Sequence, residues 1–394
     1  MRILFIHNHY QQPGGEDRAV ELESRLLEEK GHSVKVLFFE NRGITDSLIQ
    51  KIMTLKNAIH NSRSVARVRR SIQEFRPDII HVHNLFFTAS PAVLKEAYGQ
   101  GIPVVMTLHN YRTICCNALL LRENKPCEIC IHKKIPLAGI RYACYRESRL
   151  ASALVTFSTG LPKISNNWQR WVDQYIVLTA FAEKKFMHSS LGVRPEQLKI
   201  KPNFVPDTGT GDVGRESYFL FVGRLSPEKG VQVLLEAFKN MPDKEIRIAG
   251  EGPDKEAFMT DCKNSANIRF LGNCSQTDVL KLMKKSAALI FPSVWYEGLP
   301  FVILEAFSTG TPVIASDLGA MSSLIQDDYN GLVFKAGSAE ELKSAVLRFS
   351  PNDEKIYRQA RDTYLSHFNP DIHYQTVMKI YDQSIQAAKE RRGS

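Results

Sequence analysis

The sequence predicts an α/β protein of two domains, each built around a parallel β-sheet with helices on both faces. Three observations lead to this expectation. At 394 residues the chain exceeds the size at which one hydrophobic core usually keeps growing. Short apolar runs alternate with helical patterns in both halves, which is typical of parallel sheets. A stretch rich in proline and glycine, residues 202–215, divides the two series and has the composition of a linker.

The first series opens with an apolar run that is followed by a glycine-bearing loop and a helical pattern. Strands are expected at residues 3–7, 33–39, 78–83, 104–108 and 174–178. Helices are expected at residues 18–30, 91–99 and 182–190, and Gly31 ends the first of them.

The second series repeats the pattern of strand, loop and helix. Its strands are expected at residues 218–222, 245–249, 267–271, 287–292 and 312–315. We therefore expect an N-terminal domain over residues 1–205 and a C-terminal domain over residues 206–369. The last segment, residues 370–391, reads as a helix that packs back across the first domain.

Composition is that of an ordinary globular protein, with 43% hydrophobic and 24% charged residues. No apolar run reaches the roughly 18 residues of a membrane-spanning helix, and the N-terminus lacks the features of a signal peptide. Seven cysteines in such a chain favour reduced thiols over a disulfide framework. We therefore expect a cytoplasmic location.

The net charge of +9 is concentrated in two segments, residues 41–76 and 112–149. One interpretation is a solvated helical face with a chance excess of cations. The other is a surface that meets an anionic membrane or a phosphate-bearing acceptor, which would place the protein peripherally at the inner face of the membrane. Nucleic acid is disfavoured, because no known binding motif and no aromatic-interleaved basic stretch occurs.

Two loops that follow expected strands suit anionic ligands, because ligands of open parallel sheets bind beyond the carboxyl ends of the strands. In "QQPGGED", Gly14 and Gly15 precede a helix and permit close backbone approach, although a plain tight turn explains them equally well. In "GRLSPEKG", Arg224 and Lys229 suit a diphosphate, although both could be ordinary surface cations.

The stretch "SVWYEGLPFVILEAFSTGTPVIAS" places two carboxylates around a predicted helix N-terminus. The amides at Gly298 and Leu299, beside Pro300, would favour a phosphate there. A carboxylate at such a site needs neutral partners, and hydroxyl groups satisfy it without cancelling its charge. We therefore expect one of the two carboxylates, Glu297 and Glu305, to hold the hydroxyls of a nucleotide's ribose. The other would hold the hydroxyls of a sugar attached to the diphosphate.

These segments together resemble glycosyltransferase family 4, nucleotide-sugar enzymes of the GT-B type with two Rossmann-like domains facing across a cleft. The motifs that carry the resemblance span nearly the whole chain: "GGED", "PDIIHVHNL", "VMTLHNYR", "LTAFAEKKF", "FVGRLSPEKGV", "AGEGP" and "YEGLPFVILEAFSTGTPVIASD".

The resemblance implies roles for individual residues. Arg224 and Lys229 would bind the donor diphosphate, Glu305 the ribose and Glu297 the transferred sugar. It further implies that Gly14 and Gly15 line the donor phosphates and that His109, in "TLHN", contacts the donor sugar. Without the family, His109 also fits an ordinary core or loop histidine.

The resemblance implies transfer with retention of configuration, in the synthesis of cell-surface polysaccharide or glycolipid. Negative charge grows on the diphosphate as the glycosidic bond breaks, so fixed cations there stabilise the transition state. The chain contains no Asp-x-Asp pair to bring a divalent metal, so we expect metal-independent transfer. No cofactor is needed beyond the nucleotide-sugar donor, and the acceptor is expected to be a glycan or a lipid-linked precursor.

A cysteine-rich segment follows His109, and its Cys127-x-x-Cys130 spacing is compatible with a structural zinc site of four thiolates. The expected ligands are Cys116, Cys127, Cys130 and Cys144. Against this, the outer spacings match no standard finger, and free cysteine is a common buried residue.

Three other functions compete with sugar transfer. A dinucleotide-dependent oxidoreductase is disfavoured because no Gly-x-Gly-x-x-Gly follows the first strand of either domain. A nucleotide-sugar epimerase would share the architecture and the diphosphate site. A non-catalytic sugar-nucleotide-binding subunit would share the fold but not the chemistry.

Overall fold

A computed structural model describes residues 1–9, 14–40, 57, 60–86, 88–211 and 215–393. The chain forms two compact units. Unit 1 comprises Met1–Leu120, Cys127–Pro202 and His373–Ser394, and unit 2 comprises Leu121–Pro126 and Asn203–Ile372. The change of unit after Pro202 falls three residues before the boundary expected at residue 205.

Unit 1 contains a six-stranded sheet in the order β2-β1-β3-β4-β7-β8, and every neighbouring pair is parallel. The strands are β1 (Arg2–His9), β2 (Ser33–Glu40), β3 (Ile79–Val82), β4 (Val104–Leu108), β7 (Gln174–Val177) and β8 (Leu198–Ile200). The inner strands β3, β4 and β7 are buried along their whole length because helices cover both faces of the sheet.

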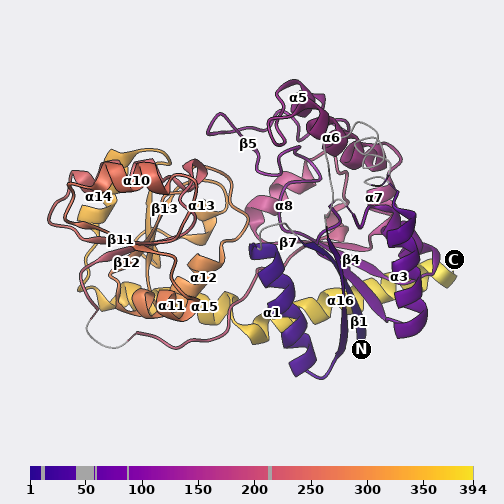
Figure 1. Ribbon diagram of the computed structural model, residues 1–394. Helices are drawn as coiled ribbons and strands as arrows, with labels where there is room; N and C mark the ends of the chain where they lie inside the picture. Colours follow the sequence, from indigo (N-terminus) through magenta and orange to yellow (C-terminus); the bar gives the residue numbers. More distant parts are fainter. Residues whose placement is uncertain (10–13, 41–56, 58–59, 87, 212–214, 394) are drawn as a thin grey trace. The chain divides into compact units, whose positions relative to one another are not determined.

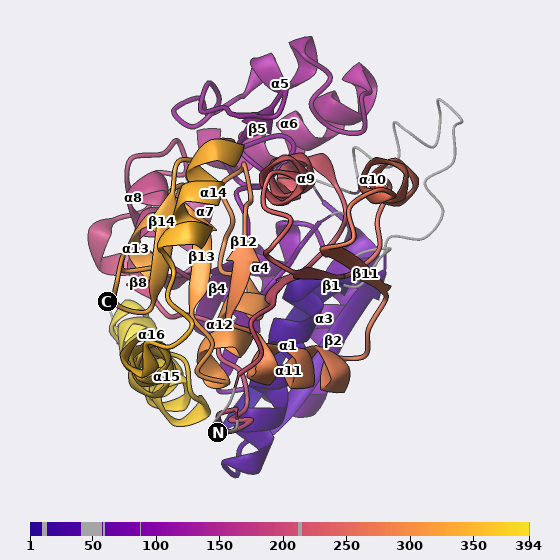
Figure 2. The same cartoon turned by 90° about the vertical axis from the view of Figure 1, so that its left-hand side faces the viewer.

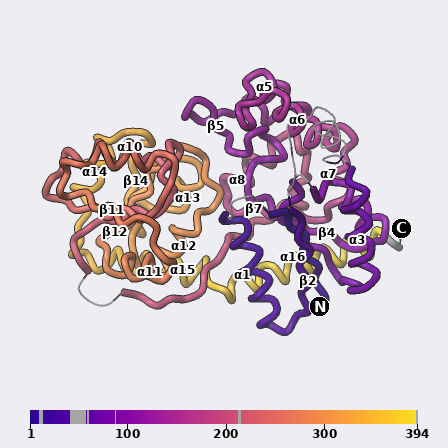
Figure 3. The backbone as a smooth tube through the Cα atoms, viewed as in Figure 1, coloured from indigo at the N-terminus to yellow at the C-terminus, as the bar shows by residue number. Residues whose placement is uncertain are grey.

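The helices of unit 1 fall into two groups, those that cover the sheet and those of a long insertion after β4. The covering helices are α1 (Gly15–Glu29), α3 (Ser62–Phe75), α4 (Ala92–Gly99), α8 (Ala180–Met187) and α16 (Pro370–Gly393). The insertion carries α5 (Leu137–Arg141), α6 (Arg149–Ile164) and α7 (Asn167–Trp171), and the α5 and α6 part lies beyond one end of the sheet (Figure 3).

The C-terminal helix α16 is part of the core of unit 1 (Figure 1). Its Val377, Ile380 and Tyr381 are buried in one cluster with Phe5 of β1 and Ile79 of β3. Phe5 and Tyr381, 376 positions apart in the chain (381 − 5), therefore share one apolar layer, and the helix is held by burial of its inner face.

Unit 2 contains a second parallel sheet, in the order β11-β10-β9-β12-β13-β14. Figure 2 shows β14, β13 and β12 side by side in that order. The strands are β9 (Phe219–Val222), β10 (Ile246–Ala249), β11 (Ile268–Gly272), β12 (Ala288–Phe291), β13 (Val313–Ser316) and β14 (Gly331–Phe334).

Helices cover both faces of this sheet, with α10 and α14 on one side and α11, α12 and α15 on the other (Figure 1). They are α9 (Val231–Lys239), α10 (Lys255–Cys262), α11 (Gln276–Lys285), α12 (Phe301–Ser308), α13 (Met321–Leu324), α14 (Ala339–Arg348) and α15 (Glu354–His367). Two short 3-10 turns, Pro195–Gln197 and Pro227–Lys229, and a small antiparallel pair, β5 (Leu121–Arg122) with β6 (Lys125–Pro126), complete the elements.

The expected fold class, two Rossmann-like α/β units with parallel sheets, is confirmed. The expectation missed the short strands β8 and β14, the insertion helices α5 to α7, and α15. β8 has only three residues, too few for an alternation pattern to be visible in the sequence. The first helix starts at Gly15 instead of residue 18, because Gly14 serves as its N-cap.

Much of the first basic segment, residues 41–56 with 58 and 59, lies outside the described residues. Its described part, α3, carries cations that are engaged with the protein itself. Arg69 pairs with Glu96 at 2.8 Å, and Arg70 pairs with Glu74 at 2.7 Å. None of the helices formed by the described residues is both long enough and apolar enough to cross a bilayer.

Candidate functional site

Strand order in unit 2 creates a point where the chain changes direction across the sheet. β10 and β11 lie on one side of β9, whereas β12, β13 and β14 lie on the other. The loops after β9 and β12 therefore leave the sheet next to each other at its carboxyl edge. Such a topological switch point is where open α/β sheets bind their ligands. The two loops are the ones that carry Arg224, Lys229 and Glu297.

Glycines let the loops at this edge pack backbone against backbone. Gly230 has φ +72°, and a Cβ there would lie 1.9 Å from the carbonyl oxygen of Pro292 in the neighbouring loop. A Cβ on Gly252, in the loop after β10, would lie 2.1 Å from the carbonyl oxygen of Leu225. The Val294 amide also donates to the Glu228 carbonyl at 3.0 Å. The backbones of these loops therefore pack directly against one another, because no side chain stands between them at Gly230 and Gly252.

Lys229 and Glu297 form an ion pair across these two loops. The Lys229 Nζ atom lies 2.6 Å from Glu297 Oε1, and the same oxygen accepts hydrogen bonds from Ser293 Oγ at 2.7 Å and Trp295 Nε1 at 2.8 Å. Glu297 is 5% exposed. Among the described residues, Oε2 receives no hydrogen bond, so this oxygen is available to accept one from a ligand hydroxyl.

Arg224 lies in the same loop after β9 as Lys229, and α12 follows the loop that carries Glu297. Arg224 is exposed, and its guanidinium makes no hydrogen bond or ion pair with the residues that the structure describes. Gly298 and Leu299 lie in the loop just before α12, and Pro300 is the N-cap of that helix. The helix begins at Phe301, so its amides, together with those of the loop, point from a helix N-terminus where an anion is favoured.

Glu305 lies on α12 and is buried, with 4% of its surface exposed. Its Oε1 atom accepts a hydrogen bond from Gln276 Nε2 at 2.8 Å. Gln276 is the first residue of α11, and nothing in the sequence singled it out. The structure therefore brings Lys229 and Glu297 into contact and gives Glu305 a different protein partner, Gln276.

Asp17 accepts hydrogen bonds that fix the glycine loop of unit 1. It was not singled out from the sequence. Asp17 Oδ1 lies 2.9 Å from His7 Nε2 and 2.7 Å from His9 Nδ1, and Oδ2 accepts the Gly14 amide at 2.9 Å. Burial alone would raise the pKa of Asp17, but the hydrogen bonds from His7, Gly14 and His9 lower it overall. Because the Gly14 N–H is taken, the amides of the first turn, starting with Gly15, are the donors left for a phosphate.

His109 follows β4 and stacks on His83, which follows β3, with ring centroids 5.2 Å apart. His83 Nδ1 and His109 Nε2 share a hydrogen bond of 2.9 Å. Loss of hydration, the Lys201 cation and neighbouring histidines lower the pKa of His109 to about 3, so its imidazole is neutral at pH 7. His109 can therefore exchange hydrogen bonds with a sugar but supplies no positive charge.

The same edge holds a cluster of amides around Glu16 that sequence reasoning also missed. Glu16 accepts from Asn84 Nδ2 at 3.3 Å and from Asn110 Nδ2. Asn84 and Asn110 directly follow His83 and His109. A small cavity of about 30 Å³, large enough for about one water molecule, is lined by these two histidines and two asparagines.

Beneath this edge lies a buried ionic network. Lys201 Nζ lies 2.7 Å from Glu23 Oε2, and His373 Nε2 of α16 lies 3.3 Å from the same oxygen. His81 Nδ1 is 3.2 Å from Glu23 Oε1 and 2.7 Å from Tyr381 Oη, also on α16. Burial alone would raise the pKa of Glu23, but Lys201 and the two histidines hold it well below its usual value.

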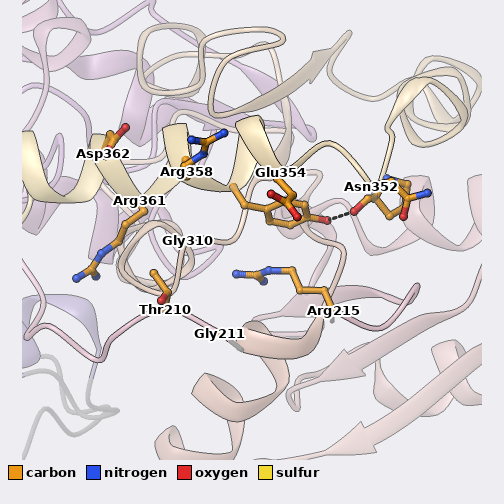
Figure 4. Close-up of a pocket in the computed structure, with 11 residues that line it drawn as sticks. Thr210, Gly211, Arg215, Gly310, Asn352, Glu354, Arg358, Arg361 and Asp362 are labelled. Carbon is orange, nitrogen blue, oxygen red and sulfur yellow. Dashed lines mark hydrogen bonds between the residues drawn. The ribbon is translucent and has the colours of Figure 1, made fainter. Parts of the chain in front are cut away.

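The larger cavity in unit 2, about 600 Å³, lies at the other end of α12, beside Gly310 (Figure 4). Its size suits a small ligand. Arg215, however, already donates to the Met283, Ser286 and Thr309 carbonyls and to Thr311 Oγ1, and it stacks on Tyr357. We therefore assign the candidate site by its chemistry, at the carboxyl edge of the sheet, and not by cavity size.

Both units and their carboxyl-edge loops correspond to the GT-B class of glycosyltransferase folds. The chain is similar to the crystal structure of Anabaena Alr3699/HepE in complex with UDP, with a TM-score of 0.65, 17% identity, and coverage of 96% of this chain and 99% of that one. Residues 13–208 match the model described as Glycosyltransferase Family 4, and residues 210–364 match the model described as Glycosyl transferases group 1. The chain belongs to the family 4 glycosyltransferases, which confirms the resemblance seen in its motifs.

Curated relatives are similar to this chain at lower coverage. A UDP-Gal:alpha-D-GlcNAc-diphosphoundecaprenol alpha-1,3-galactosyltransferase of Escherichia coli is 28% identical over 215 residues, 48% of this chain and 54% of the relative. A phosphatidyl-myo-inositol mannosyltransferase of Propionibacterium freudenreichii subsp. shermanii is 26% identical over 369 residues, 89% of this chain and 86% of the relative. Across the first curated relatives, the chain spans about half of their length, from 46% to 61%.

Proposed function

We propose that this protein transfers a sugar from a nucleotide-diphosphate sugar to a glycan or lipid-linked acceptor, with retention of configuration and without a divalent metal. The observation that carries the proposal is the Lys229–Glu297 pair, held by Ser293 and Trp295 at the switch point of unit 2. A cation that contacts a carboxylate at a helix N-terminus suits the junction between a diphosphate and its sugar.

In this proposal each group has one task. Lys229 and Arg224 bind the donor diphosphate together with amides at Gly298 and Leu299, beside the Pro300 N-cap. Glu305 holds the ribose hydroxyls, and Glu297 Oε2 accepts a hydrogen bond from a hydroxyl of the transferred sugar. In unit 1 Gly14 and Gly15 line the phosphates, with the amides from Gly15 onward as the donors, and neutral His109 hydrogen-bonds the sugar.

The transfer breaks the bond between the anomeric carbon and the diphosphate oxygen while the acceptor oxygen bonds to that carbon from the same face. The proton of the acceptor hydroxyl passes to the departing phosphate oxygen, so atoms and charge balance. Negative charge develops on the diphosphate, and Lys229 and Arg224 stabilise it there. The names of the two relatives above support a lipid-linked acceptor, because one names a diphosphoundecaprenol-linked sugar and the other a phosphatidylinositol.

A donor screen tests this proposal. Thermal shift with UDP, GDP and ADP, each free and as a sugar conjugate, is expected to find one nucleotide that raises the Tm of the wild type in the presence of EDTA. Release of that nucleoside diphosphate on adding acceptor, with the anomeric configuration of the product read by NMR, checks transfer and retention. If the labelled donor sugar changes its configuration without acceptor, the protein is an epimerase. If the donor binds but no acceptor consumes it, a binding subunit is favoured.

We further propose that the insertion of unit 1 touches an anionic membrane on which such an acceptor lies. Leu137, Tyr142 and Leu150, on and beside α5 and α6, are exposed by 59%, 45% and 43%. Basic residues surround them in the sequence: Lys133, Lys134, Arg141, Arg146 and Arg149. Exposed apolar side chains within a basic rim fit the interface of an anionic bilayer.

Vesicle sedimentation tests the membrane contact. The wild type is expected to sediment with phosphatidylglycerol vesicles at low salt and to be released at high salt. The double variant Leu137→Glu/Leu150→Glu should bind about fivefold or more weakly. Leu347→Glu, at a residue 54% exposed on α14 of unit 2, is the matched control and should bind like the wild type. Absence of binding at low salt, or an equal loss in the control, would remove this proposal.

A further inference from the structure

An arginine at the carboxyl edge of the unit 1 sheet is held in place by aromatic rings. Arg112 follows β4. Its guanidinium carbon lies 4.9 Å from the centroid of the Tyr145 ring and 5.6 Å from that of Phe86. Its Nη1 atom donates to the Cys116 carbonyl, and its own amide donates to Asn110 Oδ1 at 2.8 Å. These contacts fix the orientation of the cation before any ligand binds.

Arg112 has no anionic partner among the residues that the structure describes. The thiols of Cys115 and Cys116 interact electrostatically with it, but burial raises the pKa of both thiols, so they are neutral at pH 7. Arg112 is half-buried, and none of its nitrogens is among the buried polar atoms without a partner. The N–H donors that the protein leaves unused therefore reach solvent, where an anion can accept them.

The cysteines of the insertion do not supply a metal–thiolate anion for Arg112. Over the described part of the chain, the expected zinc ligands do not come close enough together to hold a metal ion: Cys116, Cys127, Cys130 and Cys144. Cys116 Sγ donates to the Ser152 carbonyl at 3.6 Å. Cys115 Sγ donates to Asn117 Oδ1 at 2.9 Å. Neither sulfur of this adjacent pair is therefore directed at a metal position.

A second arginine lies against the same tyrosine. The guanidinium carbon of Arg146 is 5.6 Å from the Tyr145 centroid, so Arg112 and Arg146 share one ring. Two cations on one ring repel each other, and an anion bound beside them offsets that repulsion. The planar fork of a guanidinium matches the oxygens of a phosphate, and two forks suit a group with several charged oxygens, such as a diphosphate.

The position of Arg112 suits the acceptor of the proposed reaction. Arg112 and His109 line the same cavity of about 30 Å³. This cavity admits about one water molecule, so a phosphate would lie on the open side of the guanidinium. The donor diphosphate already has Arg224 and Lys229 in the proposed function. Since His109 is proposed to contact the donor sugar, a phosphate held by Arg112 would fix the acceptor next to that sugar.

We propose that Arg112, together with Arg146, binds a phosphate or diphosphate group of the sugar acceptor. The inference rests on the proposed sugar transfer, which it narrows to acceptors that carry a phosphate near the hydroxyl that receives the sugar. Arg112 is a binding residue in this proposal and takes no part in the exchange of bonds.

Binding of inorganic pyrophosphate tests the site without any sugar transfer. The titration is followed by ³¹P NMR with the double variant Arg224→Ala/Lys229→Ala, which lacks the cations proposed for the donor diphosphate. This background should still bind pyrophosphate. Adding Arg112→Gln should weaken that binding about tenfold, because a charged donor to the anion is lost. Arg112→Lys keeps the charge without the fork and should retain part of the binding, and it replaces the glutamine variant if that one fails to fold.

Arg170→Gln, in the same background, is the matched control. The guanidinium of Arg170 also lies over a tyrosine ring, that of Tyr98, at 5.7 Å. Tyr98 is on α4, just before β4 begins, so this pair lies at the opposite, amino edge of the sheet. The control should bind pyrophosphate like the background. No pyrophosphate binding in the background, unchanged binding in Arg112→Gln, or an equal loss in the control would overturn the proposal.

Kinetics and vesicle binding identify the source of the phosphate. Arg112→Gln should raise KM for a phosphate-bearing acceptor about tenfold and leave KM for the donor unchanged. For an acceptor analogue with a neutral hydroxyl in place of the phosphate, the variant and the wild type should have the same KM. A raised KM for the donor would instead place the donor diphosphate at Arg112 and overturn the proposal.

Phosphatidylglycerol vesicles should bind Arg112→Gln and the wild type equally. A loss of vesicle binding as large as the loss of pyrophosphate binding would assign Arg112 to the bulk lipid surface and contradict the acceptor site. If no acceptor is consumed by the wild type, sugar transfer fails, but the pyrophosphate titration still decides whether Arg112 binds phosphate.

Discussion

Replacing Lys229 with alanine is expected to lower kcat for sugar transfer by about 10²- to 10³-fold while the fold stays intact. Lys229 is the cation that reaches Glu297 across the two loops, at 2.6 Å. In the transition state it would face the charge that develops on the leaving diphosphate, where a fixed cation contributes most. Steady-state kinetics with the donor found in the screen measure the effect.

Two variants serve as comparisons for Lys229→Ala. Lys281→Ala removes an exposed cation of α11 that pairs with Asp278 at 3.4 Å, and it should leave kcat unchanged. Glu297→Gln removes negative charge beside the diphosphate position, so the free nucleoside diphosphate should bind several-fold more tightly while transfer slows. A Lys229→Ala enzyme with normal kcat, or weaker nucleotide binding in Glu297→Gln, would contradict the proposed placement of the diphosphate.

Replacing Lys201 with methionine is expected to destabilise unit 1 by about 3–5 kcal/mol at pH 7.5. The variant leaves the Glu23 carboxylate buried between α1 and α16 without its cation, which now lies 2.7 Å away. Because the two units need not unfold together, the measurement is hydrogen exchange of the β1 and β3 amides.

The pH dependence separates this effect from a simple loss of packing. In the wild type the pKa of Glu23 is well below its usual value. The ionised Glu23 therefore contributes its full stabilisation above the ordinary carboxyl pKa of about 4.3. This stabilisation is lost as the pH falls through the pKa that Glu23 has in the folded protein. Without Lys201, burial acts on Glu23 with only His81 and His373 to oppose it, so the pKa of Glu23 is higher than in the wild type and a proton taken up as the pH falls relieves the variant. The stability difference should therefore shrink as the pH falls.

The double variant Glu23→Gln/Lys201→Met completes this cycle. It should recover much of the stability lost in Lys201→Met, because no charge remains buried without a partner. A stability difference that stays constant from pH 7.5 to 5, or a double variant less stable than the single one, would show that the charge of the pair is not the cause.

Local patterns in the sequence were sufficient for the parts of the fold that local chemistry controls. Apolar runs marked the inner strands of both sheets, and glycine and proline marked the loops after β9 and β12. The C-terminal helical pattern corresponds to α16, which runs from Pro370 to Gly393. Short edge strands and the helices of the insertion escaped detection, because their stability comes from packing against distant segments and not from their own periodicity.

The candidate site, like the fold, could be predicted from the sequence only in part. Lys229 and Glu297 could be singled out from motif spacing, but their ion pair needed the parallel pairing of β9 with β12, which no local pattern reveals. Gln276, Asp17 and His83 were not singled out from the sequence, although Asp17 and His83 lie within its motifs, because each gains its role only through a partner on another element.

By itself, the sequence determined two α/β units, the charged loops at their strand ends and a family membership, because helix and strand periodicity, glycine placement and motif spacing are written along the chain. Tertiary structure decided which carboxylate meets Lys229 and that Glu23 and Lys201 are buried together. Those outcomes depend on strand order and on contacts between residues up to 178 positions apart, as for Glu23 and Lys201. Only a folded chain brings such residues within the few ångströms over which charges and hydrogen bonds act.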